Sequence, residues 1–208
     1  QGSVDSSTNN HEITLSGNWA NTGSFNPRLG TVYLDRASGI QTIDSGDIGI
    51  GKAFYNLTHS GAGTLQLITN PIDIDGDFTN TSGSFNANNL NMLIGGDWSN
   101  SANFISGSNT VTFDGAGLQT LNSGGITDTQ DFYNLTHSGS GTLQLITNNI
   151  DIDGNFTNSN GAFDTNNLNM YVEGNWANSA SFNATTGTVT FDKTSGAQTL
   201  NSGGIGIG

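Results

Sequence analysis

Short stretches of the chain alternate apolar and polar residues, and turn-forming residues separate one stretch from the next. Residues 72–75 (Ile-Asp-Ile-Asp) and 110–113 (Thr-Val-Thr-Phe) are two examples. Alternation with a period of two is typical of a strand that buries one face, and the intervening Ser-Gly, Asn-Asn and Gly-Ala-Gly clusters are turn signals. No stretch has the apolar spacing of a helix. The pattern therefore predicts an all-β protein built from short strands.

This pattern belongs to a long internal repeat. Residues 54–61 (FYNLTHSG) return unchanged as residues 132–139, and a Gly-(Asn/Asp)-Trp element ends at Trp19, Trp98 and Trp176. A regular recurrence of this kind indicates a stacked array in which neighbouring copies bury a shared core. We expect residues 1–208 to form a single continuous domain, divided into a partial unit, a complete unit and a second partial unit: 1–53, 54–131 and 132–208.

Each unit subdivides into related segments of about 20 residues, a length typical of the smallest solenoid repeats. Residues 76–80 (GDFTN), for example, are followed one segment later by the related residues 96–100 (GDWSN). A β-propeller blade needs about 40 residues or more, whereas the coils of a β-solenoid are short and stack with a rise of about 4.8 Å set by inter-strand hydrogen bonds. We therefore predict a parallel β-helix, or β-solenoid, of about ten coils of ~20 residues, with four coils per 78-residue repeat and a length of roughly 50 Å.

Aromatic residues keep step with this coil period. Phe78 and Trp98 lie one segment apart, and Phe156 and Trp176 repeat the pair. Equivalent positions of successive coils stack along the axis of a solenoid, so these rings are predicted to form ladders in the interior. The alternative is a row of exposed rings that grips a sugar chain. Inward rings would favour a scaffold, and outward rings would favour a binding surface.

Composition and charge narrow the range of functions. The 208 residues include 4 Lys and Arg, 17 Asp and Glu and no Cys, and the formal charge is −13. Four basic residues cannot neutralise a row of phosphates, so nucleic-acid binding is not expected. No stretch approaches the roughly 18 apolar residues that a membrane helix needs, so membrane insertion is not expected either. The absence of Cys excludes disulfides, zinc–thiolate clusters and thiol nucleophiles.

One acidic motif is a candidate calcium site. Residues 73–77 read Asp-Ile-Asp-Gly-Asp, and residues 151–155 of the next copy read Asp-Ile-Asp-Gly-Asn. If the isoleucines point inward, the first two carboxylates share the outer face, and Ca²⁺ favours several hard oxygen ligands. A full calcium loop needs more ligands than this, and other coils have Gly here, so a simple turn is the competing interpretation. The candidate calcium ligands are Asp73, Asp75, Asp77, Asp151 and Asp153.

No catalytic or cofactor-binding residue stands out beside this motif. Catalytic sites are normally unique, whereas these carboxylates recur with the scaffold, and no Lys or Arg stands beside them. His59 and His137 occupy one repeat position about 19 Å apart, too far to share a metal ion. Thr110 and Thr188 lie in Thr-x-Thr pairs similar to those of ice-binding solenoids, but such an array would be sparse. We therefore expect a protein that is not an enzyme.

The Gly-Asn-Trp, Gly-Thr-Val, Gln-Thr-Leu and Phe-Tyr-Asn-Leu-Thr motifs, in this order, resemble those of large secreted bacterial cell-surface proteins built of β-strand repeats. The resemblance covers nearly the whole chain. It implies an extracellular adhesin stalk or surface fibre with a right-handed parallel β-helix. It brings no particular ligand and no catalytic residue.

The ends of the sequence bear on assembly. Residues 198–208 match residues 41–51, and neither end carries a polar capping coil, so both would expose unpaired strand edges. We expect either an excerpt of a longer array or a subunit that docks head to tail on copies of itself. The predicted function is a structural, non-enzymatic rod or filament at the cell surface. The alternative is an adhesin or carbohydrate-binding module that uses one face for a cell-surface or polysaccharide ligand.

Overall fold

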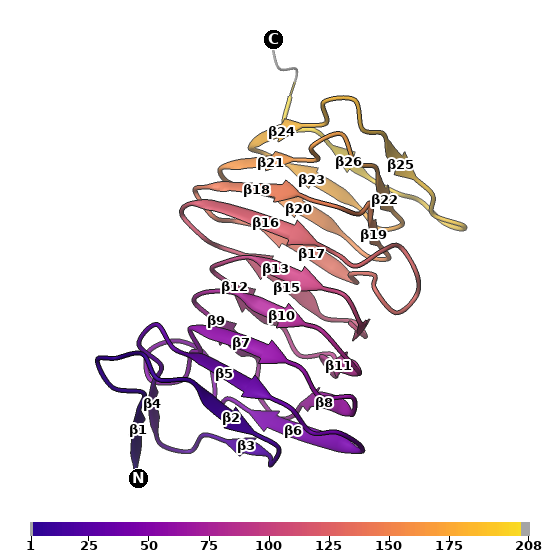
Figure 1. Ribbon diagram of the computed structural model, residues 1–208. Helices are drawn as coiled ribbons and strands as arrows, with labels where there is room; N and C mark the ends of the chain where they lie inside the picture. Colours follow the sequence, from indigo (N-terminus) through magenta and orange to yellow (C-terminus); the bar gives the residue numbers. More distant parts are fainter. Residues whose placement is uncertain (1, 205–208) are drawn as a thin grey trace.

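The computed structural model describes residues 2–204, which hold 26 strands and no helix (Figure 1). Every pairing between strands is parallel, and each strand pairs with strands about one coil away in the sequence. The chain winds through stacked coils from β1 at one end to β26 at the other (Figure 1). The predicted β-solenoid of about ten coils is confirmed. No helix in the described part of the chain is long and apolar enough to cross a membrane.

The strands line three faces of the solenoid. The first face is one nine-stranded sheet: β2 (Ile13–Leu15), β5 (Thr31–Leu34), β7 (Asn56–His59), β10 (Phe78–Asn80), β13 (Trp98–Asn100), β16 (Leu118–Asn122), β18 (Thr142–Leu145), β21 (Ala162–Asp164) and β24 (Ser181–Asn183). The second face holds β3 (Trp19–Ala20), β6 (Ile40–Asp44), β8 (Thr64–Leu67), β11 (Ser84–Asn86) and β14 (Asn103–Ile105), then β19 (Ile150–Ile152), β22 (Met170–Val172) and β25 (Val189–Phe191). The third face holds β4 (Ser24–Asn26), which pairs with β1 (Ser3–Asp5), then β9 (Ile72–Ile74), β12 (Met92–Ile94), β15 (Thr110–Phe113), β17 (Asn134–His137), β20 (Phe156–Asn158), β23 (Trp176–Asn178) and β26 (Leu200–Asn201).

Two loops interrupt the strands, at equivalent places of the repeat. Residues 45–53 lie between β4 and β9, where the Phe25 amide donates to the Gly51 carbonyl and Phe54 bridges to Ile74. Residues 123–131 lie between β14 and β19, where Phe132 bridges to Ile152 in the same way. The first loop therefore occupies a position on the third face, and the second loop occupies a position on the second face.

The core is a stack of side chains that follows the strand register. Phe78 pairs with Trp98, and their ring centroids are 4.4 Å apart. Phe156 and Trp176 repeat this contact at 4.3 Å. The inward residues of each strand are fully or almost fully buried through the middle of the chain. The predicted interior aromatic ladders are confirmed, because period-two alternation places one side of every strand inside.

The pairing register corrects the predicted four coils in each repeat unit to three and two-thirds. One unit consists of the ten strands β7–β16 and the loop 123–131, which together fill eleven positions on three faces, or three and two-thirds coils. Four full coils along the first face run from Leu57 to Leu145, a longer stretch of chain than one unit. As a result β17, the copy of β7, lies on the third face rather than the first. Successive units are turned by one face, and so are the loops that they carry.

Asparagine makes several of the tight turns. Asn88 and Asn89 have φ values of 51° and 62°, and Asn166 and Asn167 have 51° and 68°. These values lie in the left-handed region, which Asn tolerates better than most residues. The abundance of Asn at turns is therefore a requirement of the backbone.

Candidate functional site

The Asp-Ile-Asp motifs form the outer edge of two corners of the solenoid. We call the loop 45–53 together with β9 the first corner, and the loop 123–131 together with β19 the second corner. At each corner the isoleucines are fully buried, whereas Asp73 and Asp151 are half-buried and Asp75 and Asp153 are exposed. The predicted inward direction of the isoleucines is confirmed. Within residues 2–204, no three His, Asp or Glu side chains already stand in a metal-binding arrangement.

Asp77, the last residue of the first motif, has a structural partner. Its Oδ1 accepts a hydrogen bond from the Asp97 amide of the next coil at 2.8 Å, and its own amide donates to Asn56 Oδ1 at 2.8 Å. Asn155 takes the same place in the next copy and accepts from the Asn175 amide at 2.8 Å. Because Asp and Asn serve equally here, this position is part of an axial ladder of turn residues and needs no charge.

The second corner carries more acid than the motif alone suggests. The register places Asp131 beside Asp151, and it stacks Asp153 with Glu173 and Asp192 in the two following coils. Asp128 lies at the exposed tip of the loop. Asp131 is 6% exposed, and its Oδ1 is buried without a hydrogen-bond partner. Sequence reasoning missed Asp131, although it lies one residue before a strand-like bridge opposite Asp151.

Burial raises the pKa values of these carboxyl groups. The pKa of Asp131 rises to about 7, first through burial and then through the charges of Asp151 and Asp153. The pKa of Asp151 rises to about 6 through burial and the charges of Asp153 and Asp192. At the first corner, burial followed by the charge of Asp73 raises the pKa of Asp75. The second corner can therefore hold a proton or a cation near neutral pH.

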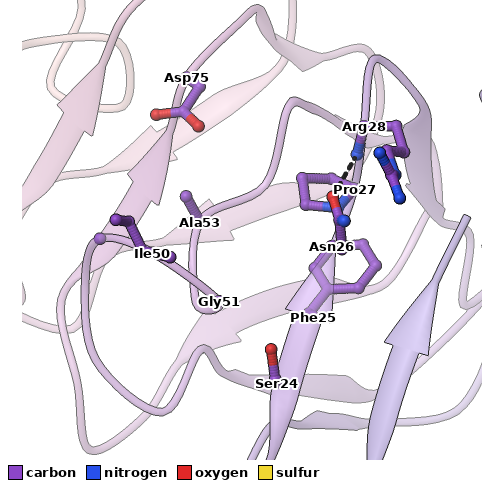
Figure 2. A pocket seen from close by; sticks show the side chains of 10 residues that line it. Ser24, Phe25, Asn26, Pro27, Arg28, Ile50, Gly51, Ala53 and Asp75 are labelled. Carbon is purple, nitrogen blue, oxygen red and sulfur yellow. Dashed lines mark hydrogen bonds between the residues drawn. The ribbon is translucent and has the colours of Figure 1, made fainter.

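Shallow hollows adjoin both corners. The first corner opens into a hollow of about 440 Å³, where Ile50, Ala53 and Asp75 lie around the loop (Figure 2). Beside the second corner, Tyr133, Asp153, Glu173 and Lys193 line a hollow of about 260 Å³. Tyr133 is 37% exposed. The second hollow thus combines a ring with carboxylates, whereas the first is mainly apolar near the loop.

A second polar feature is entirely buried. His59 Nδ1 lies 2.8 Å from Asn80 Oδ1, and Asn80 Nδ2 donates to Asn100 Oδ1 at 2.8 Å. Asn100 Nδ2 then donates to the Ser123 carbonyl at 2.8 Å. Because the amide oxygen of Asn80 accepts, His59 carries its proton on Nδ1. We call this run, residues 59, 80, 100 and 123, the buried polar ladder, and its copy begins with His137 and Asn158 at 2.9 Å.

Three glutamines join consecutive coils in the same way. Gln119 Nε2 donates to the Ile94 carbonyl at 2.9 Å and to the Gly96 carbonyl at 2.7 Å, while its Oε1 accepts from the Gly115 amide. Gln41 and Gln198 bond to the equivalent carbonyls of their own copies. These residues open the recurring Gln-Thr motif, whose role sequence reasoning left unassigned. The available signal in the sequence was the recurrence of a glutamine at the same place in each copy.

The buried histidines predict a pH dependence of stability. Burial lowers the pKa values of His59 and His137, and the bond to Asn80 or Asn158 offsets part of that effect. The unfolded chain therefore takes up protons more readily as the pH falls through about 6.5, and the free energy of unfolding decreases. Asp131 and Asp151 act in the opposite direction, since their raised pKa values favour the folded state as the pH falls from about 7.

Urea unfolding at pH 7.5 and pH 5.5 separates the two contributions. Between pH 7.5 and pH 5.5 the free energy of unfolding of the double variant His59→Gln, His137→Gln is expected to shift further in favour of the folded state than that of the wild-type chain. Equal shifts in the two proteins would show that the histidines are not held neutral by burial. Circular dichroism at pH 7.5 checks that the double variant keeps its strands.

Comparison of the chain with protein-family models, with curated proteins and with solved structures finds no match. The resemblance to secreted cell-surface repeat proteins therefore stays a prediction.

Proposed function

We propose that this protein is a structural, non-enzymatic repeat protein that forms a rod or head-to-tail filament at the outer cell surface. One observation carries the proposal. The nine-stranded sheet of the first face runs from β2 to β24 without a break at the junction between units. The repeat unit therefore has no boundary of its own, and stacking can continue for any number of coils.

The interior supports a mechanical role. The aromatic ladders, the buried polar ladder and the three glutamines all connect one coil to the next along the axis. These side-chain contacts act together with the backbone hydrogen bonds between neighbouring strands. Separating two coils therefore requires both sets of interactions to break at once. A rod with such a core is expected to be stiff along its length.

The last coil offers a template for further growth. β25 and β26 are the copies of β15 and β16, onto which β17 and β18 stack in the preceding unit. The same register would accept further repeats of this chain or the first coil of a second copy. Both arrangements give a longer rod.

The adhesin or carbohydrate-binding alternative has weaker support. Most aromatic side chains, including Phe78, Phe104 and Trp98, are buried and so are withheld from a ligand. The exposed ring of Tyr133 is a single side chain beside carboxylates, rather than part of a row. One exposed ring does not make a continuous sugar-binding face.

Electron microscopy of the native protein, purified from the organism that produces it, tests the proposal. We expect straight, unbranched rods of uniform width that lengthen with repeat number or with protein concentration. Discrete particles of the size of a single chain, at high concentration and with no continuation of the chain, would contradict it. The double variant Leu200→Lys, Phe191→Lys places charges at exposed positions of β25 and β26 and is the matched control for end-to-end docking.

A further inference from the structure

The two corners share a scaffold but differ in charge. At the first corner the loop carries Ile50 and Ala53 next to Asp75 (Figure 2). At the second corner the equivalent loop positions, one repeat later, are Asp128 and Asp131. Two apolar residues are thus replaced by acids where the following coil already places Asp151 and Asp153. Like charges one coil apart repel, so this change is unfavourable unless something else occupies the corner.

The first corner satisfies its carboxylate with the loop itself. The Gly49 amide donates to Asp73 Oδ2 at 2.9 Å. In the described part of the chain no equivalent bond reaches Asp151 at the second corner, where Thr127 stands at the position of Gly49. Among residues 2–204 the one ion pair joins Arg28 to Asp5; Arg28 lines the hollow beside the first corner, and this pair does not involve the second corner. Lys193 lines the hollow beside Asp153, but within residues 2–204 Asp131 and Asp151 have neither a loop amide nor an ion-paired basic side chain as partner.

Asp131 shows where the missing partner would lie. Its side chain is on the same side as that of Asp151, because Phe132 and Ile152, the residues that follow them, bridge with both side chains in the core. The residue is only 6% exposed, yet Oδ1 makes no hydrogen bond. A buried carboxylate oxygen without a donor is costly, and a bound cation removes that cost. The adjoining loop adds the side-chain oxygens of Thr127 and Gln130, which lie 3.1 Å apart.

We propose that the second corner binds one hard divalent cation of the calcium class, with Asp131 and Asp151 as its fixed ligands. Asp128, at the exposed tip of the loop, and loop carbonyls or water would complete the six to eight oxygen ligands that Ca²⁺ takes. The first corner, with Ala53 and Ile50 in place of the two acids, does not bind it. The cation ties the loop 123–131 to β19 and so closes the solenoid at the position where a strand is missing. The proposal is independent of filament formation.

Terbium luminescence provides the test, because Tb³⁺ replaces Ca²⁺ and is excited through nearby tyrosine. Tyr171 pairs with Asp151 in the register of β22 and β19. Tyr133 lies beside Asp153, because the residues that precede them, Phe132 and Ile152, form a bridge. We expect the wild-type chain to bind one Tb³⁺ with tyrosine-sensitised emission, and Ca²⁺ to displace it. Asp131→Ala is expected to weaken Tb³⁺ binding at least tenfold. Asp151→Asn is expected to weaken binding as well, whereas Asp73→Asn, the same change at the equivalent position of the first corner, is expected to leave it unchanged.

Thermal unfolding adds a readout that does not use emission. The midpoint of the wild-type chain is expected to rise with Ca²⁺ at pH 7.5, and the midpoint of Asp131→Ala to stay constant. Since the equivalent residue at the first corner is alanine, Asp131→Ala is expected to unfold cooperatively without Ca²⁺. Equal binding by the wild type and Asp131→Ala would overturn the proposal. The proposal would also be overturned if acid stabilised the wild type and millimolar Ca²⁺ did not. In that case a proton, rather than a cation, would neutralise the second corner.

Discussion

Trp98→Ala is expected to lower the free energy of unfolding by about 3–5 kcal/mol, the usual cost of a large cavity in a packed core. Trp98 is 1% exposed, and its ring packs against those of Phe78, Phe104, Phe113 and Phe132. Its ring centroid lies 4.4 Å from that of Phe78, 5.0 Å from Phe104 and 5.2 Å from Phe132. Deleting the indole removes contacts to the coils on both sides at once. Urea or guanidinium titration of the purified variant measures the loss.

Trp98→Phe is the matched control. Phenylalanine already occupies the equivalent place one coil earlier, at Phe78, and the change removes the indole Nε1, which is buried without a partner. We expect a clearly smaller loss than for Trp98→Ala, because phenylalanine keeps the ring contact with Phe78 and leaves a smaller cavity. A loss below about 1 kcal/mol for Trp98→Ala itself would mean that the aromatic ladder is not packed as described.

Asn80→Ala is expected to cost about 3 kcal/mol or more, because it interrupts the buried polar ladder in its middle. Asn80 is fully buried and makes three hydrogen bonds: with His59 Nδ1 at 2.8 Å, Asn100 Oδ1 at 2.8 Å and the Asn103 carbonyl at 2.9 Å. Alanine leaves the buried His59 Nδ1 without its partner, removes the bond to the Asn103 carbonyl, and leaves Asn100 Oδ1 with the Ala102 amide at 3.3 Å. An unsatisfied buried polar group typically costs about 1–3 kcal/mol.

Thr79→Ala provides the comparison on the same strand. Thr79 precedes Asn80 in β10, and its side chain points outward and is half-buried. A surface substitution of this kind is expected to change the free energy of unfolding by less than about 0.5 kcal/mol. Similar losses for Thr79→Ala and Asn80→Ala would show that the strand, rather than the ladder, sets the cost.

The inward-facing core could be predicted from the sequence for a physical reason. Alternation assigns one side of each strand to the interior, and the separation of Phe78 and Trp98 by one coil places them in contact. The rotation of each successive unit by one face about the solenoid axis could not be predicted. It depends on the loop 123–131 filling a strand position, and the sequence of that loop does not show a strand.

The second corner was only partly predictable. Asp151 and Asp153 stand out as a motif, but Asp131 becomes a candidate ligand only when the loop covers it and the bridge aligns it with Asp151. Asp77 shows the converse case, since a carboxylate in the same motif proves to be a turn acceptor that Asn155 replaces. Spacing identifies acids on one face, whereas burial and hydrogen bonding decide which of them lack a partner.

X-ray diffraction from oriented fibres of the purified native protein tests the stacked-rod arrangement most directly. Because the strands cross the rod axis and stack along it, a reflection at about 4.8 Å is expected parallel to the fibre axis. A reflection at about 4.8 Å perpendicular to that axis, or well-oriented fibres without any such reflection, would contradict the arrangement.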